Sequence, residues 1–206
     1  LKEKITEKKK INNFSFRLFR AIKENETKEI ILEWFRNIEK NIFTSCVIVG
    51  NFKNKSLTTD IALEYLCKNI TNIDYGCVTI FHRKNELNRC LNREKIGCKF
   101  FVSQIIVNTN NNSITDAILN NIRTPVYITI TPIFSEKICI LLKSLGVYFN
   151  NNFKCPKNDY EIYNHLEKLI KLIKITKKCI ISIDILSHSK KRRINQLVKF
   201  NKLICN

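Results

Sequence analysis

A polar side chain stands at the end of an otherwise apolar run, where it could hold a ligand. The run 97–104 reads Gly-Cys-Lys-Phe-Phe-Val-Ser-Gln, and in extended form it places Phe100, Val102 and Gln104 on one face. Gln104 therefore lies at the carboxyl end of a predicted strand. In a parallel α/β sheet or barrel, ligands sit at that end. An amide suits such a position because it offers a hydrogen-bond donor and an acceptor together.

The predicted helix 86–96 brings charge next to this strand. Glu86, Arg89 and Arg93 are spaced i, i+3, i+7 and share one stripe of the helix. The same periodicity leaves an apolar stripe toward the sheet, made of Leu87, Cys90, Leu91 and Cys98. A charged stripe beside a strand-end amide could hold a polar ligand that carries phosphate. Such a stripe is equally typical of a solvated helix face, and spacing does not separate the two interpretations.

Apolar runs alternate with amphipathic segments along the whole chain. The predicted strands are 14–22, 45–51, 76–81, 99–107, 126–133 and 179–186. The predicted helices are 24–40, 58–68, 86–96, 113–122, 135–145, which ends at a capping Gly146, 159–177 and 191–204. Continuous apolar strands that alternate with helices indicate an α/β fold with a buried parallel sheet.

Periodicity does not choose between a doubly wound sheet and a (β/α)8 barrel of the TIM-barrel type. The chain has four Gly and no Gly-x-Gly-x-x-Gly turn, which excludes a glycine loop for nucleotide phosphates and favours the barrel. A barrel of this type has eight strands. The six predicted β-α units therefore indicate an incomplete barrel, and the absence of linkers or repeats predicts a single domain over 1–206.

Composition narrows the protein class further. The nine Cys form no Cys-x-x-Cys pair and the chain has three His, so neither a zinc site nor a disulfide framework is indicated. No apolar run approaches the roughly 18 residues that a membrane span needs. The amino end is charged and lacks the apolar region of a signal peptide. The sequence therefore predicts a cytoplasmic protein without a membrane partner.

The net charge of +18 raises the question of a polyanionic partner. Two clusters, 8–10 and 190–193, could contact the phosphates of RNA or another polyanion. However, the charge is spread along the chain together with abundant Asn and Ile, as an A+T-rich coding sequence would produce. The aromatic-interleaved signature of an RNA-binding strand is also missing. These features disfavour nucleic acid, and a basic binding module stays open as an alternative.

The run 83–104 resembles the signature of the methylenetetrahydrofolate reductase family. In that family acidic and basic residues at these spacings precede a Gly-Cys/Ala-x-Phe-Phe-Val/Ile-Thr/Ser-Gln strand. Weaker collinear resemblance covers 18–21, 47–51, 76–80, 131–133, 145–147 and 181–187. The resemblance implies a (β/α)8 barrel with FAD or another flavin, and NAD(P)H as the hydride donor. The implied reaction reduces 5,10-methylenetetrahydrofolate to 5-methyltetrahydrofolate, so the implied small-molecule partner is a folate.

The resemblance also implies roles for single residues. Gln104 matches the family glutamine that bonds the pterin ring, and Asp184 matches an acidic position near the substrate. The positions matching flavin contacts or their neighbours are Gly50, Asn51, Glu86, Arg89, Arg93 and Arg20. His82, in the loop before the helix 86–96, is open between a site residue and an exposed loop residue.

This chain departs from the family pattern at its amino end. If strand 14–22 matches the third barrel strand, the first two strands are missing, together with the family glutamate on the first. No catalytic residue is therefore assigned. We expect an N-terminally truncated fragment, an inactive pseudoenzyme, or a chain that completes its sheet with another copy or another protein.

Overall fold

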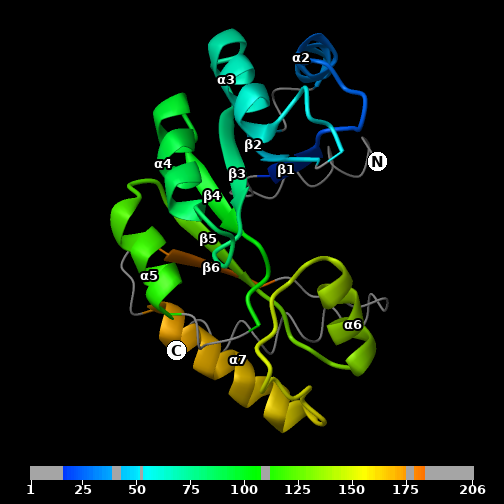
Figure 1. Ribbon diagram of the computed structural model, residues 1–206, viewed down its shortest axis with the longest axis vertical. Helices are drawn as coiled ribbons and strands as arrows, with labels where there is room; N and C mark the ends of the chain where they lie inside the picture. The colour runs from blue at the N-terminus through cyan, green and yellow to red at the C-terminus, as the bar shows by residue number, and fades with distance from the viewer. Residues whose placement is uncertain (1–15, 39–42, 52, 108–111, 175–178, 184–206) are drawn as a thin grey trace, which may run out of the picture. The chain divides into compact units, whose positions relative to one another are not determined.

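The computed structural model of the chain describes residues 16–38, 43–51, 53–107, 112–174 and 179–183 (Figure 1). Its strands are β1 Phe16–Ala21, β2 Phe43–Val49, β3 Asp74–Thr79, β4 Phe100–Ser103, β5 Val126–Ile130 and β6 Cys179–Ile183. Its helices are α2 Lys28–Asn37, α3 Thr59–Asn69, α4 Glu86–Ile96, α5 Asn112–Asn121, α6 Glu136–Ser144 and α7 Asp159–Lys174. The helix predicted over 191–204 lies outside the described residues.

The six strands are neighbours in chain order, β1-β2-β3-β4-β5-β6. The pairs β1/β2, β2/β3, β4/β5 and β5/β6 are all parallel. A doubly wound sheet reverses its strand order at a switch point, whereas a (β/α)8 barrel keeps the order of the chain. The order therefore confirms the α/β class and the barrel-type arrangement. Within the described residues the sheet is open, as predicted for an incomplete barrel.

The described residues fall into two compact units. The first unit comprises residues within 1–77 and 96–99, and the second comprises residues within 78–95 and 100–206. The strand β3 contributes to both, because the division falls after Cys77.

The first unit packs two helices on its strands. The helix α2 lies beside α3, and α3 packs on β2 (Figure 1). Phe35 of α2 is fully buried and meets the ring of Tyr75 edge-on, with the centroids 5.5 Å apart. Burying a side chain of this size stabilises the fold by about 1.5–3 kcal/mol.

The helix predicted over 24–40 begins later than expected. It starts at Lys28, because the hydroxyl of Thr27 accepts the N–H of Ile30 and caps the helix. The preceding residues form a turn instead, in which the carboxylate of Glu26 accepts the N–H of Lys23 at 2.9 Å. Polar side chains that bond their own backbone compete with helix formation, and here they decide where α2 starts.

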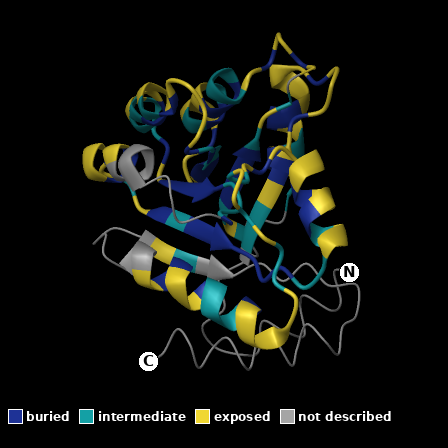
Figure 2. Ribbon diagram, turned by 60° about the horizontal axis from the view of Figure 1, so that its bottom comes forward, coloured by how far each residue is buried: buried dark blue, intermediate teal, exposed yellow. Residues whose placement is uncertain are grey.

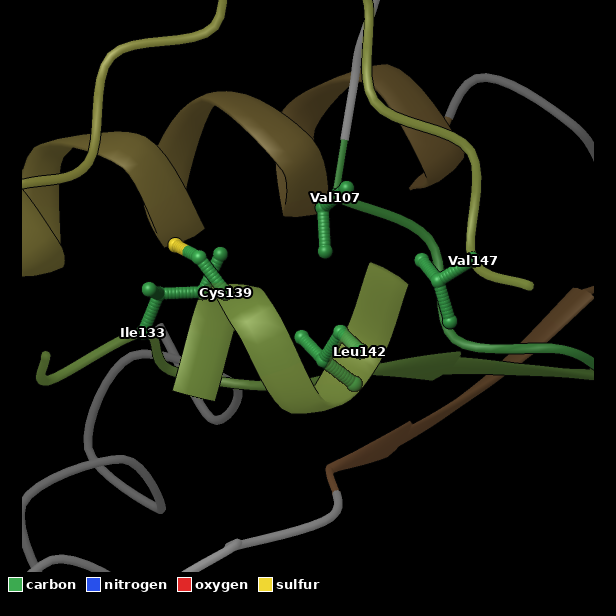
Figure 3. Packing of buried hydrophobic residues seen from close by; sticks show 5 residues of the cluster. All are labelled: Val107, Ile133, Cys139, Leu142 and Val147. Carbon is green, nitrogen blue, oxygen red and sulfur yellow. The ribbon is translucent and has the colours of Figure 1, made fainter. Parts of the chain in front are cut away.

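The second unit has two hydrophobic contacts that organise its helices. The helix α7 packs on β5 and β6. The shorter helix α6 belongs to a separate cluster, whose buried members are Val107, Ile133, Cys139, Leu142 and Val147 (Figure 3). Val107 follows β4 and Ile133 follows β5, so this cluster places α6 at the carboxyl ends of those two strands. The strands β4 and β5 are mainly buried, whereas the helices carry exposed residues on their outer sides (Figure 2).

The strand predicted over 99–107 is shorter in the structure. The strand β4 ends at Ser103, and an isolated bridge pairs Ile106 with Ile130. The N–H of Gln104 bonds Thr79 on the β3 side, whereas the N–H of Ile106 bonds Thr129 on the β5 side. Residues two apart in a regular parallel strand bond the same neighbour, so the ladder breaks between them. Gln104 therefore stands at the break.

Candidate functional site

The helix α4 turns polar side chains toward β3. Glu86, Cys90 and Arg93 are its buried residues, and the two charged ones are each 2% exposed. The Nη1 of Arg93 donates to the carbonyl of Val78 at 3.0 Å. The Sγ of Cys90 lies 3.4 Å from the hydroxyl of Thr79. The Oε1 of Glu86 accepts the N–H of Ile80 at 2.9 Å. Side chains of α4 spaced i, i+4, i+7 thus contact three successive residues at the end of β3, Val78, Thr79 and Ile80.

This arrangement corrects the predicted orientation of the helix. The predicted charged stripe is split, because Glu86 and Arg93 are buried while Arg89 is exposed. Leu87 and Leu91, expected to face the sheet, are half-buried. Charged residues rarely occupy a core unless they are paired. For this reason the sequence predicted that Glu86 and Arg93 lie on the solvent side of the helix. Here hydrogen bonds to the β3 backbone compensate for burial.

Two guanidinium groups compensate the buried charge of Glu86. The Nη1 of Arg83 and the Nε of Arg89 each lie 3.8 Å from its Oε2, while both arginine side chains remain partly exposed. This oxygen has no hydrogen-bond partner among the described residues. One carboxylate therefore faces two cations, which leaves a local excess of positive charge beside the end of β3.

Gln104 lies where the sequence placed it, after β4. Its Nε2 donates to the carbonyl of Leu145 at 3.0 Å. Its Oε1 is buried and has no hydrogen-bond partner among the described residues. The Leu145 carbonyl accepts a donor and so fixes which way round the amide stands. The result is an oriented acceptor with unused hydrogen-bonding capacity.

The carbonyl that holds Gln104 belongs to the end of α6. Gly146 adopts φ +75°, as the predicted capping glycine requires. The N–H groups of Gly146 and Val147 bond the carbonyls of Lys143 and Leu142, both at 2.9 Å. These two bonds form a Schellman motif, which ends α6 firmly and leaves the Leu145 carbonyl for the amide of Gln104.

Two further polar residues lie at strand ends of the second unit: Thr131, to which the sequence assigned no role, and His82, which it left open between a site residue and an exposed loop residue. Thr131 follows β5 directly, is fully buried, and its hydroxyl has no hydrogen-bond partner among the described residues. His82 follows β3, and its ring lies 5.4 Å from that of Tyr148 with a 33° tilt. Partial burial lowers the pKa of His82, Arg83 adds to this shift, and Glu86 opposes it. The neutral ring is therefore favoured in the stacked pair.

Only some of these residues carried a signal in the sequence. Thr131 stands before Pro132 at the end of a predicted strand, so its position could have been found by the argument that was applied to Gln104. Tyr148 carried no such signal, because the ring that it meets is 66 positions earlier in the chain.

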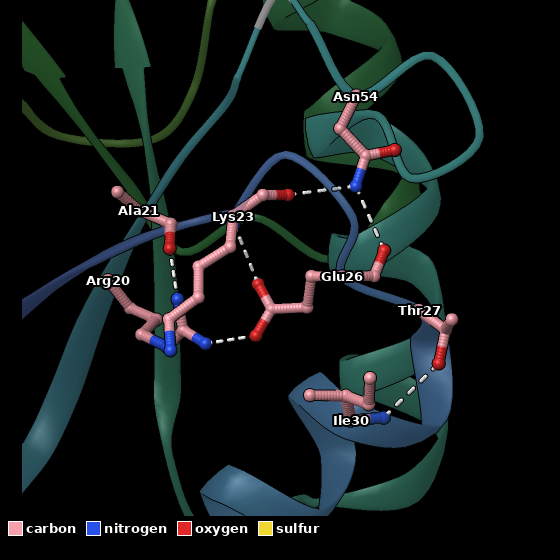
Figure 4. Close-up of polar contacts among 7 residues, drawn as sticks. All are labelled: Arg20, Ala21, Lys23, Glu26, Thr27, Ile30 and Asn54. Atoms are coloured by element: carbon pink, nitrogen blue, oxygen red, sulfur yellow. Dashed lines mark hydrogen bonds and ion pairs between the residues drawn. The ribbon is translucent and has the colours of Figure 1, made fainter.

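In the first unit Arg20 is buried within a network at the end of β1 (Figure 4). Its guanidinium bonds the carboxylate of Glu26 and the carbonyl of Ala21, and lies 4.7 Å from the ring centroid of Trp34. Asn54 ties the network together, because its Nδ2 donates to the carbonyls of Lys23 and Glu26, both at 2.9 Å. These partners bury Arg20, so its role as a flavin contact, which the resemblance implies, stays a prediction.

The other candidates of the first unit, Gly50 and Asn51, make local packing and turn contacts. Gly50 lies so close to α3 that an added Cβ would meet the Oγ1 of Thr59 at 2.4 Å. The Oδ1 of Asn51 accepts the N–H of Lys53 at 3.0 Å, which is a turn contact. Asp184, predicted near the substrate, lies outside the described residues.

The implied flavin contacts do not fit this geometry well. Glu86 and Arg93 bond the backbone of β3, and Arg20 pairs with Glu26. Of the implied phosphate contacts, Arg89 alone presents a partly exposed guanidinium. Nothing tests flavin binding directly, so the assignment stays a prediction. No disulfide joins the cysteines whose side chains the structure describes, which are Cys46, Cys67, Cys77, Cys90, Cys98, Cys139 and Cys155. Within the described residues no group of His, Cys, Asp or Glu could hold a metal ion. None of the described helices combines the length and the apolar character of a membrane span.

Comparison with known proteins gives a match in fold. Neither a protein-family model nor a curated protein matches the chain. A solved structure of an uncharacterized protein from Clostridium thermocellum, which binds two copies of 5-methyl-5,6,7,8-tetrahydrofolic acid, matches with a TM-score of 0.69. The two are 18% identical, and the match covers 88% of this chain and 70% of that one.

Dihydropteroate synthase from Xanthomonas albilineans, in complex with 7,8-dihydropteroate, matches with a TM-score of 0.45 at 15% identity. That match covers 91% of this chain and 76% of the synthase, but a TM-score this low carries no argument. The chain thus shares its TIM-barrel-like fold with the Clostridium thermocellum protein. Membership of the methylenetetrahydrofolate reductase family is not shown.

Proposed function

We propose that the chain binds a reduced folate at the strand ends of the second unit, with Gln104 as the contact to the pterin ring. The observation that carries the proposal is the buried Oε1 of Gln104, which has no hydrogen-bond partner among the described residues. Leaving a buried acceptor unpaired costs about 1–3 kcal/mol. A ligand N–H group that reaches this oxygen would recover that cost.

The chemistry of a folate matches the groups around Gln104. A pterin ring carries N–H donors on its pyrimidine edge, which suit an acceptor that the Leu145 carbonyl has oriented. The stacked rings of His82 and Tyr148 offer an aromatic surface for a flat ligand. Arg83 and Arg89 supply positive charge for the carboxylates of the glutamate tail. That a protein of the same fold binds 5-methyltetrahydrofolate supports this choice of ligand.

Calorimetric titration with 5-methyltetrahydrofolate tests the proposal. We expect the wild-type chain to bind it and Gln104→Ala to weaken binding about tenfold, which corresponds to one lost hydrogen bond. Asn88→Ala, an exposed amide on α4, is the matched control and should bind as the wild type does. Absence of binding to the wild type, or equal affinity for Gln104→Ala, would overturn the proposal.

A more specific proposal is the activity that the family resemblance implies, in which the chain reduces 5,10-methylenetetrahydrofolate with a flavin and NAD(P)H. The residue geometry favours folate binding over this redox role. Consumption of NAD(P)H by the purified protein, with added FAD and methylenetetrahydrofolate, would support it. Folate binding without such consumption supports a binding protein or an inactive relative. Retention of RNA without folate binding would favour the basic binding module.

A further inference from the structure

One peptide group lies between Glu86 and Gln104. The carbonyl of Thr79 accepts the backbone N–H of Gln104 at 2.8 Å. The N–H of the same peptide group, which belongs to Ile80, donates to the Oε1 of Glu86 at 2.9 Å. The carboxylate on α4 and the backbone of the proposed pterin contact are therefore joined through a single rigid plane.

The charge and the burial of Glu86 make its hydrogen bond with the Ile80 N–H strong. A hydrogen bond from a backbone N–H to a carboxylate is roughly twice as strong as one between neutral groups. Glu86 is 2% exposed, so little water competes for its oxygens. Its remaining oxygen faces the guanidinium groups of Arg83 and Arg89 at 3.8 Å, which compensate the buried charge.

We propose that Glu86 is a positioning residue that fixes Gln104 for ligand binding through the Thr79–Ile80 peptide group. This rests on the proposed function, in which Gln104 contacts the pterin ring. The Leu145 carbonyl holds the side-chain amide of Gln104, and the Thr79 carbonyl holds its backbone. Removal of the carboxylate frees the peptide plane to tilt, which displaces the backbone anchor of Gln104. A displacement of 1 Å in a binding group can cost about a hundredfold in function.

Arg93 provides a matched control on the same face of α4. It is buried to the same degree as Glu86, and its Nη1 donates to the carbonyl of Val78. That carbonyl belongs to the peptide group before the one that Gln104 contacts. Loss of the Arg93 guanidinium should therefore destabilise the contact of α4 with β3 and leave the position of Gln104 nearly unchanged.

The first experiment measures affinity for 5-methyltetrahydrofolate in a double-mutant cycle. Glu86→Leu should weaken binding about tenfold. Glu86→Gln, which keeps an acceptor for the Ile80 N–H, should restore affinity to within about threefold of wild type. In the Gln104→Ala background, Glu86→Leu should cause no further loss. Wild-type affinity for Glu86→Leu, failure of the glutamine rescue, or additive losses would overturn the proposal.

The second experiment needs no ligand, so it separates this proposal from the proposed function. Amide hydrogen exchange is compared between Gln104, bonded to Thr79, and Ile106, bonded to Thr129. Glu86→Leu should accelerate exchange at Gln104 at least tenfold relative to Ile106, and Arg93→Met should not. If Glu86→Leu does not fold, Glu86→Asp, which withdraws the carboxylate by one methylene, takes its place. Equal acceleration at both amides, or none at Gln104, would overturn the positioning role whatever the ligand.

Discussion

The polar groups at the end of β1 and those at the end of β4 occupy equivalent places in a parallel sheet and use their hydrogen bonds differently. In the first unit the charges of Arg20 and Glu26 neutralise each other, and Asn54 uses both ends of its amide, while the Nε of Arg20 has no hydrogen-bond partner among the described residues. In the second unit Gln104 uses its donor, while its acceptor has no hydrogen-bond partner among the described residues.

The difference shows that a strand-end position does not define a site. In the sequence, both residues lie near the end of a predicted strand. What separates them is that Glu26 pairs the charge of Arg20 within the protein, whereas the acceptor oxygen of Gln104 has no hydrogen-bond partner among the described residues. The network around Arg20 supports the fold, whereas the acceptor of Gln104 costs stability unless a ligand meets it.

The largest expected effect is on the stability of the first unit. Arg20→Met leaves the buried carboxylate of Glu26 without its cation, and loss of one partner of a buried pair costs about 3–5 kcal/mol. Urea unfolding should show this loss, and Arg20→Met with Glu26→Leu together should recover much of it. Affinity for 5-methyltetrahydrofolate in the folded protein should stay unchanged. A loss of affinity equal to that of Gln104→Ala would show that the Arg20 network also takes part in folate binding, contrary to the contrast between the two strand ends.

A smaller effect of opposite sign is expected at the end of β5. Thr131→Val removes a buried hydroxyl that has no hydrogen-bond partner among the described residues and keeps the side-chain shape. The free energy of unfolding should therefore rise by about 1 kcal/mol. Thr131→Ser keeps the hydroxyl, loses a methyl group and should lower stability instead. Destabilisation by valine would show that the hydroxyl has a partner and that this strand end is closed.

The smallest expected effect is a pH dependence that arises from α7. Burial lowers the pKa of His165 below its ordinary value of 6.5, although a backbone hydrogen bond with Val107 opposes the shift. The unfolded chain then binds the proton more readily, so stability is complete above about pH 6.5 and falls as the pH drops below it. Urea unfolding at pH 7 and pH 5 should show a smaller difference for His165→Gln than for wild type. An unchanged difference would assign the acid sensitivity to other groups.

The sequence predicted the elements of the fold well and the contacts between them poorly. Six strands and the helix Glu86–Ile96 follow from apolar runs and helical spacing, which are local properties. The buried face of that helix was predicted in part. Cys90 is buried as expected, but Glu86 and Arg93 are buried too, because they bond backbone groups that no side-chain pattern reveals. Strand order, which identified the barrel type, also depends on pairing between distant segments.

The candidate site shows the same limit. Gln104 was found because strand alternation places it at the end of an apolar face. Its orientation depends on Leu145, 41 positions later, and no periodicity links two such residues. The family resemblance implied that Arg20 contacts the flavin. Its partner Glu26 lies in a turn that helical periodicity had assigned to the helix 24–40.

Folate binding at Gln104 is tested most directly by an NMR titration of the labelled 24.3 kDa chain with 5-methyltetrahydrofolate. We expect the side-chain amide signals of Gln104 to shift, because its Oε1 has no hydrogen-bond partner among the described residues, and the backbone signal of Gly146 to shift, because Gly146 lies beside the Nε2 of Gln104. The guanidinium signals of Arg20 should stay in place. Shifts confined to the Arg20 network, or no shift at Gln104 at saturating ligand, would show that Gln104 does not contact the folate.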